Sequence, residues 1–341
     1  MNDHPAQPVE RPVGLETEFG LLCAPAGPLE AAKSDLPDVE RAAALIFRHR
    51  PVGYRSTNLF LPNGGRLYLD IGAHPEYATA ECVSVRDLVA QDQAGRAILA
   101  DMAKRAAAGL SQEGIAVRFH LLANNTDSAG HTYGCHESYS VPRSLLDAPD
   151  DASAGSSETT MAVLTSFLAT RPVLVGSGRP LEGGPAEPNE DSPGVQDEES
   201  AWGLSPRAPH LQALTSADTT GQRALVNTRD EPHADPQRWR RLHLVAGDAN
   251  CFDTIAWLKL GMTALVLQVL ADGVPAAWRR LRLADPVAQA RDVSRDTRLQ
   301  GRLDLADGRR LSALEILEHY LQAVRSHLKD HGRPAPAPHG D

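Results

Sequence analysis

Residues 66–71 constrain the fold most strongly, because polar and apolar side chains alternate there without a break. Arg66, Tyr68 and Asp70 occupy every second position, and leucine or isoleucine fills the positions between them. Successive side chains of a β-strand point to opposite faces, so this spacing predicts a strand with three polar groups on one face. A cation, a phenol and a carboxylate are an unusual combination for a solvated strand face. This face is therefore a candidate functional site.

Other segments predict strands with similar polar faces. The spacing of Glu16 and Glu18 puts both carboxylates on one face of a strand over 12–24. Arg241 and His243 share a face of a later strand in the same way. The polar positions that we expect to converge are Glu16, Glu18, Arg66, Tyr68, Asp70, His136 or Glu137, Arg241 and His243.

The rest of the chain mixes strands with helices and shows no internal repeat. Apolar residues at helical spacing predict helices over 39–48, 84–110, 158–169, 255–270 and 312–329, and Ser84 is expected to cap the second of them. Alternation and turn residues predict strands over 58–62, 66–71, 115–123, 133–141, 224–228 and 241–247, the first two joined by a hairpin. An antiparallel sheet can pack helices on one face and leave the other free, so we expect an α+β fold.

Composition limits the class of function. The net charge of −10 argues against a general nucleic-acid binder, which needs a basic surface. The four cysteines are widely spaced, so we expect reduced thiols in a cytoplasmic protein and neither a disulfide framework nor a zinc site. The polar N-terminus lacks a signal-peptide core, and the apolar run over 260–270 is too short and interrupted to span a membrane.

Three segments are expected to lie outside a packed domain over 12–330. Residues 1–11 predict a disordered lead-in, and 331–341 predict a proline-rich tail. Residues 178–200 are rich in glycine, proline and acidic side chains, which predicts a disordered insertion.

The polar face has a chemistry of its own. Several carboxylates on one sheet face repel one another unless cations lie between them. Oxygen ligands favour magnesium or manganese, and Arg66, Arg229 and Arg241 offer guanidinium groups for phosphates. The pattern therefore predicts a nucleotide–metal site, although the sequence has no phosphate-binding loop of the G-x-x-x-x-G-K-[ST] type. Taken singly, each motif is also compatible with an ordinary solvated surface, so the prediction rests on their co-occurrence.

Four long motifs carry these residues. They are GLETEFG at 14–20, RLYLDIGAHPEYATAEC at 66–82, NTDSAGHTYGCHESY at 125–139 and NTRDEPHADPQRWRRLHLVAGDAN at 227–250. Together they resemble the Pup ligase/depupylase family of glutamine-synthetase-like carboxylate–amine ligases, in the family's order. The amino-acid sequences of the first and third motifs resemble those of the ligase branch. The chain also lacks the long early insertion of the depupylase branch.

The resemblance implies a curved antiparallel sheet that forms a cradle backed by helices. It implies an enzyme that uses ATP and magnesium to phosphorylate the C-terminal glutamate side chain of the small modifier Pup, which a lysine then attacks to form an isopeptide bond. The implied magnesium ligands are Glu16, Tyr68 and Glu76; the implied ATP contacts are Arg66 and Thr79; the implied catalytic base is Asp70. Looser correspondences imply metal or nucleotide contacts for Glu18, Glu137 and His243, and phosphate contacts for Arg229 and Arg241.

These implied roles carry a structural prediction. Glu76 and Thr79 have opposite parity in a regular strand, so both can face one site only if the chain bulges. We therefore predict a bulge or kink between His74 and Thr79.

The chain departs from the family at its C-terminal end. The family's smaller C-terminal domain is expected to be absent or supplied by a separate chain. Two alternatives to a Pup ligase therefore stay open: a stand-alone ligase that joins glutamate or a peptide carboxylate to a small amine, and a weak homologue that binds nucleotide or a partner protein. ADP release with small amines but not with Pup would indicate the first, and nucleotide binding without turnover the second. Neither nucleic acid nor a membrane is expected as a partner.

Overall fold

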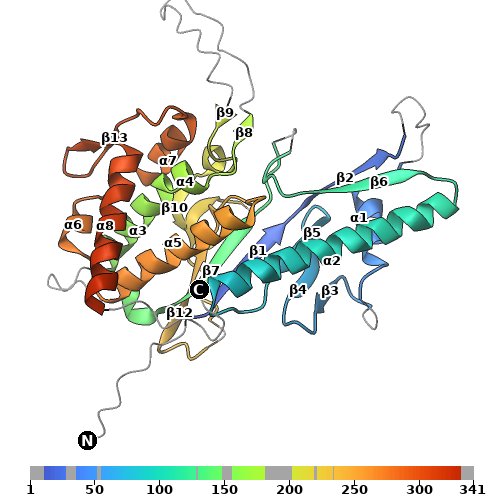
Figure 1. Ribbon diagram of the computed structural model, residues 1–341, viewed down its shortest axis with the longest axis horizontal. Helices are drawn as coiled ribbons and strands as arrows, with labels where there is room; N and C mark the ends of the chain where they lie inside the picture. Colours follow the sequence, from blue (N-terminus) through green and yellow to red (C-terminus); the bar gives the residue numbers. More distant parts are fainter. Residues whose placement is uncertain are drawn as a thin grey trace, which may run out of the picture. The chain divides into compact units, whose positions relative to one another are not determined.

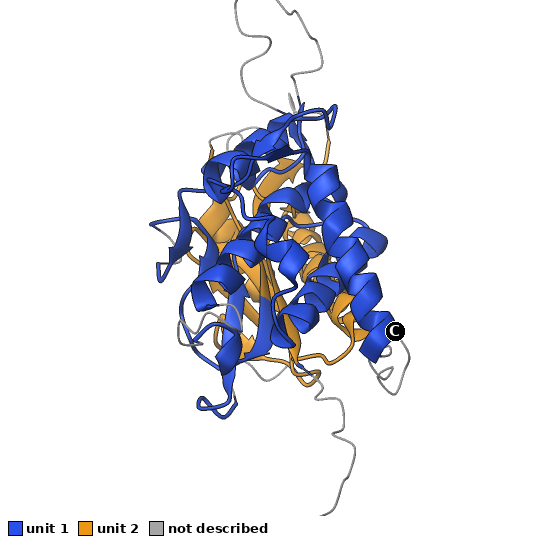
Figure 2. Ribbon diagram, turned by 90° about the vertical axis from the view of Figure 1, so that its left-hand side faces the viewer, with its two compact units in different colours: residues 1–11, 138–340 blue, residues 12–137, 341 orange. Residues whose placement is uncertain are grey.

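The chain, seen in a computed structural model, divides into two compact units, coloured separately in Figure 2. The structure describes residues 11–27, 36–51, 55–127, 130–147, 156–180, 202–218, 221–232 and 234–331. The N-terminal unit spans Pro12–Glu137, and the C-terminal unit comprises Arg11 and the chain from Ser138 onward. Apart from Arg11, residues 178–180 and His331, the predicted lead-in, insertion and tail lie outside the described residues. The predicted domain limits stay a prediction.

The N-terminal unit builds a β-sheet and packs helices against it (Figure 1). Its strands are β1 (Val13–Glu18), β2 (Gly20–Pro25), β3 (Asn58–Phe60), β4 (Arg66–Asp70), β5 (His74–Ala78), β6 (Val117–Leu122) and the first residues of β7 (Cys135–Pro142). Its helices are α1 (Val39–Phe47) and α2 (Val85–Gln112). The strand order in the sheet is β7–β1–β5–β4–β3, and β2 pairs with β6 in a separate antiparallel ribbon. The predicted hairpin is confirmed as β3 and β4, with Gly64 at a positive φ of 83°.

The segment over 12–24 forms two strands, where the sequence pattern predicted one. β1 pairs with β5, whereas β2 leaves the sheet and pairs with β6. The change of partner occurs at Phe19, whose backbone N–H donates to the Pro75 carbonyl. Gly20 leaves room for the Tyr133 ring at this point, because a Cβ there would lie 2.6 Å from the Tyr133 hydroxyl. Alternation alone cannot reveal such a switch, because both strands keep the same side-chain period.

Helix α2 holds β1 in place. Ser84 caps its start by accepting the Asp87 N–H, as the sequence predicted. Farther along the helix, buried Asp92 accepts a hydrogen bond from the Thr17 hydroxyl at 2.7 Å. Thr17 lies between Glu16 and Glu18, so this bond fixes the strand segment that carries both carboxylates.

The ring of Tyr77 leaves no room for a side chain at Gly95 of α2. A Cβ at Gly95 would lie 2.2 Å from a Tyr77 ring carbon, whereas a Cβ at Gly109 of the same helix would meet nothing within 4 Å. We expect Gly95→Ala to lower the free energy of unfolding by about 1–3 kcal/mol, because overpacking outweighs the gain of ~1 kcal/mol in helix propensity. Gly109→Ala is the matched control and should stabilise. Urea unfolding measures both, and a stabilising Gly95→Ala would contradict the packing argument.

The predicted bulge lies farther along the chain than the sequence argument placed it. Pairing of β5 with β1 and β4 is regular throughout His74–Ala78. The register slips by one residue afterwards, because Thr17 pairs with Tyr77 whereas Val13 pairs with Cys82. The prediction of a bulge between His74 and Thr79 is therefore wrong, and the extra residue falls between Thr79 and Cys82.

The C-terminal unit packs helices on a smaller set of strands (Figure 1). Its helices are α3 (Ser157–Thr170), α4 (Pro172–Val175), α5 (Asp253–Ala271), α6 (Ala276–Arg279), α7 (Pro286–Arg295) and α8 (Ala313–His331), with 3-10 turns at Arg143–Leu145 and Ala208–His210. Its strands are β8 (Arg179–Pro180), β9 (Trp202–Gly203), β10 (Ala213–Ser216), β11 (Ala224–Asn227), β12 (Trp239–Leu244), β13 (Leu303–Asp304) and β14 (Arg310–Leu311). The strand order is β10–β11–β12–β7.

Three features of this unit differ from expectation. β10 and β11 run parallel, so the sheet is not wholly antiparallel. Helix α7 was not predicted, although Asp285 caps it and Pro286 takes its first position, which is a recognisable start signal. Strands β8, β9, β13 and β14 have only two residues each, too few for alternation to reveal. The α+β class is confirmed.

The apolar run that was predicted to be too short for a membrane belongs to a longer helix. By length and composition alone, the 19 residues of α5 suffice to span a bilayer, so that prediction is wrong as regards length. Buried core helices pass the same test, and in α5 the buried residues include Lys259, whose ammonium group donates to the Asp248 carbonyl at 2.6 Å. The packing of its buried residues in this unit accounts for part of the apolar composition of α5.

Candidate functional site

Strand register places the polar side chains of the N-terminal unit in rows on one face of its sheet. Glu76 of β5 lies directly between Glu18 of β1 and Tyr68 of β4. In the next row, Glu16 and Arg66 flank β5 on either side. Directly opposed residues share a face, so the period-two expectation for these strands is confirmed.

Three carboxylates of this face form a close cluster. Glu18, Asp70 and Glu76 each offer an oxygen, and these atoms lie within 4.8 Å of one another. Asp70 is exposed at the end of its strand, whereas Glu76 is only 5% exposed. Burial raises the pKa of Glu76 to about 8; a hydrogen bond with Tyr68 opposes the shift, and the charges of Glu16, Glu18 and Asp70 add to it. Burial, reinforced by the neighbouring carboxylates, therefore disfavours the ionised form of Glu76.

Tyr68 and Arg66 form the other half of this face. Burial and then the negative charges of Glu76 and Glu16 raise the pKa of the Tyr68 phenol, so its hydroxyl stays protonated and hydrogen-bonds to Glu76. The Arg66 guanidinium lies over the Tyr68 ring, with its central carbon 4.3 Å from the ring centroid, and its Nε donates to Asn58. Arg66 thus lies beside the carboxylates, held by the Tyr68 ring and by Asn58.

Glu18 is anchored at both of its oxygens. Oε1 lies 2.6 Å from Nδ1 of His74, and Oε2 accepts the Gly134 backbone N–H at 2.6 Å. The hydrogen bond to Glu18 raises the pKa of His74, against the opposing effect of burial. The His74 ring also meets Tyr133 edge to face, with centroids 5.2 Å apart. Glu18 is accordingly the most constrained carboxylate of the cluster.

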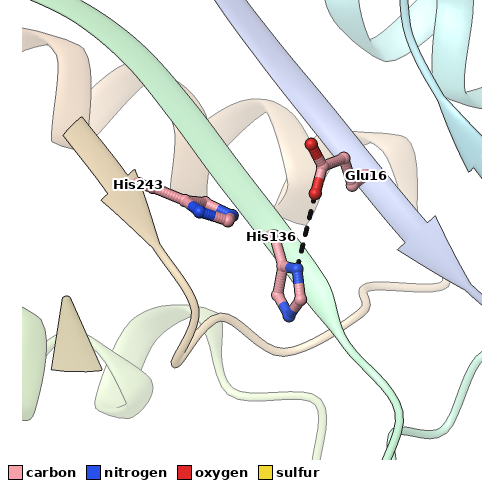
Figure 3. A group of neighbouring side chains, drawn as sticks. All are labelled: Glu16, His136 and His243. Atoms are coloured by element: carbon pink, nitrogen blue, oxygen red, sulfur yellow. Dashed lines mark ion pairs between the residues drawn. The ribbon is translucent and has the colours of Figure 1, made fainter. Parts of the chain in front are cut away.

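Glu16 pairs with His136, and Glu137 points the other way. Nδ1 of His136 lies 3.5 Å from a Glu16 oxygen, as Figure 3 shows. Along β7, Cys135 and Glu137 are buried and His136 is half-buried, so Glu137 faces the core side of the strand. The prediction that Glu137 joins the metal-binding face is therefore wrong, and His136 is the residue of that pair on the face of Glu16.

Thr79 has a structural contact that accounts for its hydroxyl. Its backbone N–H donates to the Leu15 carbonyl, and its Oγ1 accepts the Leu15 N–H at 3.0 Å. The hydroxyl oxygen thereby accepts a hydrogen bond that a backbone carbonyl would accept in a regular strand pair, next to the bulge. This contact ties Thr79 to β1, and the nucleotide contact predicted for Thr79 stays a prediction.

The remaining predicted residues belong to the C-terminal unit. Arg229 is exposed and lies 3.9 Å from Glu231. Nε of Arg241 donates to the Ser138 hydroxyl, and its Nη1 lies 4.0 Å from Glu231. His243, also labelled in Figure 3, is a buried residue of β12. Arg229 and Arg241 therefore lie near the same carboxylate, that of Glu231, and the phosphate contacts predicted for both stay a prediction.

Two histidines complete the face, and sequence reasoning gave them too little weight. His74 and Glu76 are two residues apart in β5, so strand alternation already put both side chains on the face of the cluster. His136 was considered only as an alternative to Glu137. Cys135 and Tyr139, each two residues from Glu137, indicated that Glu137 lies on the buried face of the strand. Alternation was thus the available signal in both cases.

The donor set suits a hard divalent cation. The clustered side chains offer carboxylate oxygens, which magnesium and manganese prefer, and no thiolate lies among them. A bound cation would also favour the ionised form of Glu76, whose pKa is raised by burial and then by the neighbouring carboxylates. The residues present therefore fit a magnesium or manganese ion.

Comparison with known proteins identifies the family. Residues 11–337 match the family model described as Pup-ligase protein. The Pup–protein ligase of Kineococcus radiotolerans is 41% identical over 95% of this chain, and that of Kocuria rhizophila is 42% identical over 94%. The chain spans 64% of the length of each of these relatives.

Solved structures agree with the sequence comparison. The crystal structure of the complex between the prokaryotic ubiquitin-like protein Pup and its ligase PafA matches 97% of this chain with a TM-score of 0.78 and 36% identity, and the chain covers 59% of it. The structure of PafA in complex with ADP matches 91% of this chain with a TM-score of 0.67 and 37% identity. The chain belongs to the Pup ligase family.

Proposed function

We propose that this chain catalyses the ATP-dependent joining of a glutamate side-chain carboxylate of a Pup-type modifier to a lysine of an acceptor protein. The observation that carries the proposal is the clustering of Glu18, Asp70 and Glu76 beside Arg66 and Tyr68. Relatives named Pup–protein ligase and a relative solved with Pup support the choice of modifier. A relative solved with ADP supports the nucleotide. A cytoplasmic location, where ATP is available, belongs to the same proposal.

Magnesium is the cation proposed for this site. Glu16, Glu76 and the Tyr68 oxygen would hold it, with Glu18 as a further oxygen ligand. When bound, it supplies positive charge that offsets the negative charge of the transferring phosphoryl group. Arg66 adds a guanidinium on the same face, which suits it to orient a phosphate.

Two chemical steps follow from these groups. In the first, a glutamate carboxylate oxygen attacks the γ-phosphorus of ATP, which gives an acyl phosphate and ADP. In the second, the lysine amine attacks the acyl carbon, and inorganic phosphate leaves as the amide bond forms. A lysine ammonium is not nucleophilic, so a base must accept a proton, and exposed Asp70 at the end of β4 is the proposed base.

The test measures ADP release and the conjugate together. The purified chain is incubated with magnesium ATP, an acceptor protein and Pup ending in glutamate. We expect ADP release that depends on Pup, together with a conjugate whose mass equals the sum of the two proteins less one water. Pup ending in glutamine is the matched control and should give neither. ADP release with small amines alone, and none with Pup, would overturn the proposal in favour of a stand-alone amine ligase.

A further inference from the structure

The Glu18–His74 contact is the best-defined interaction at the edge of the carboxylate cluster. Both side chains are largely enclosed, with 11% of Glu18 and 20% of His74 exposed. Nδ1 of His74 and Oε1 of Glu18 lie 2.6 Å apart, which is hydrogen-bond distance. An ionised carboxylate only accepts, so the Nδ1 atom must be the donor. The second oxygen of Glu18 is held separately by the Gly134 backbone N–H.

Two anchors on one carboxylate fix its plane. With Gly134 alone, the Glu18 carboxylate could rotate about that single hydrogen bond. When His74 also binds the carboxylate, the free lone pairs of the Glu18 oxygens stay in a fixed direction relative to Asp70 and Glu76. His74 is itself held by the edge-to-face contact with Tyr133, which is 2% exposed. A series of contacts, from Tyr133 through His74 to Glu18, therefore connects the core of the N-terminal unit with the cluster.

We propose that His74 is a positioning residue, whose Nδ1–H orients Glu18 as an oxygen ligand of the cation. The inference rests on the proposed function only in taking Glu16, Glu18, Tyr68 and Glu76 as the cation site. It deepens that function by assigning a role to a side chain that would not itself touch the cation. Groups that orient metal ligands in this way typically change metal affinity by about 10–100-fold when they are removed.

The geometry provides a sharp pair of substitutions. The amide nitrogen of asparagine takes nearly the same position relative to the backbone as Nδ1 of histidine, whereas that of glutamine corresponds to Nε2. His74→Asn should therefore keep the donor to Glu18, and His74→Gln and His74→Ala should lose it. His120→Asn on exposed β6 is the matched control for a histidine lost from the same unit.

The experiment measures Mn²⁺ binding by electron paramagnetic resonance in the presence of ADP, with thermal unfolding as a check on folding. We expect His74→Ala and His74→Gln to weaken Mn²⁺ binding by about 10–100-fold, and His74→Asn and His120→Asn to stay close to the wild-type chain. Equal binding by all variants would overturn the proposal, and so would an equal loss in His74→Asn and His74→Ala. Mn²⁺ affinity is measured without Pup. The result therefore tests the role of His74 even if the chain does not ligate Pup.

Discussion

Asp70→Asn is expected to lower the rate of Pup–lysine conjugation by about 100- to 10,000-fold, the usual contribution of a general base. The side chains are nearly isosteric, but an amide cannot accept the proton that the lysine ammonium must lose. Formation of the acyl phosphate needs no base, so ADP formation in a single turnover should persist. Conjugate formation and ADP formation, measured in parallel, should therefore separate in this variant.

Hydroxylamine distinguishes a base from a metal ligand at this position. It is mostly neutral near pH 7 and can attack an acyl phosphate without first losing a proton. Asp70→Asn should therefore still produce the hydroxamate of Pup at close to the wild-type rate. Loss of hydroxamate and conjugate together would show that Asp70 acts in phosphoryl transfer instead. Asp101→Asn, on the exposed face of α2, is the matched control and should leave both rates unchanged.

Glu76→Gln is expected to flatten the pH dependence of stability in the metal-free chain and to weaken cation binding at the same time. The pKa of Glu76 is raised from 4.5 to about 8, so between these values the folded chain keeps a proton that the unfolded chain releases. Stability of the wild-type chain should therefore fall as pH rises from about 5 to about 8. Each pKa unit corresponds to about 1.4 kcal/mol, so the total change is a few kcal/mol. A neutral glutamine has no such titration.

Thermal unfolding between pH 6 and 9, with and without Mg²⁺, measures both effects. Without Mg²⁺ the advantage of Glu76→Gln over the wild-type chain should grow with pH. With Mg²⁺ the wild-type chain should recover stability at high pH, because the cation offsets the cluster charge, and the variant should gain less. A wild-type chain whose stability is unchanged across this range would contradict the charge assigned to the cluster. Glu113→Gln, at the exposed end of α2, is the control.

The amino-acid pattern by itself determined most of the elements and the composition of the polar face. Alternation requires only neighbouring residues, so Arg66, Tyr68 and Asp70 could be placed on one face of β4 before any tertiary contact was known. The Ser84 cap and the turn before Gly65 are equally local, and both occur as predicted. Pairing of oppositely running strands then followed from the hairpin. Local periodicity was also sufficient to put Glu16 and Glu18 on one face of β1.

Tertiary structure decided which strand a residue pairs with and what else each side chain touches. The switch from β1 to β2 at Phe19 depends on partners distant in sequence, and the slip before Cys82 depends on the register with Val13. The bond between Thr79 Oγ1 and the backbone of another strand could not be predicted from local periodicity. His74 gains its role from Glu18, which lies 56 residues away in the chain. Periodicity reports the face of a strand, whereas a binding role depends on long-range contacts that only the folded chain defines.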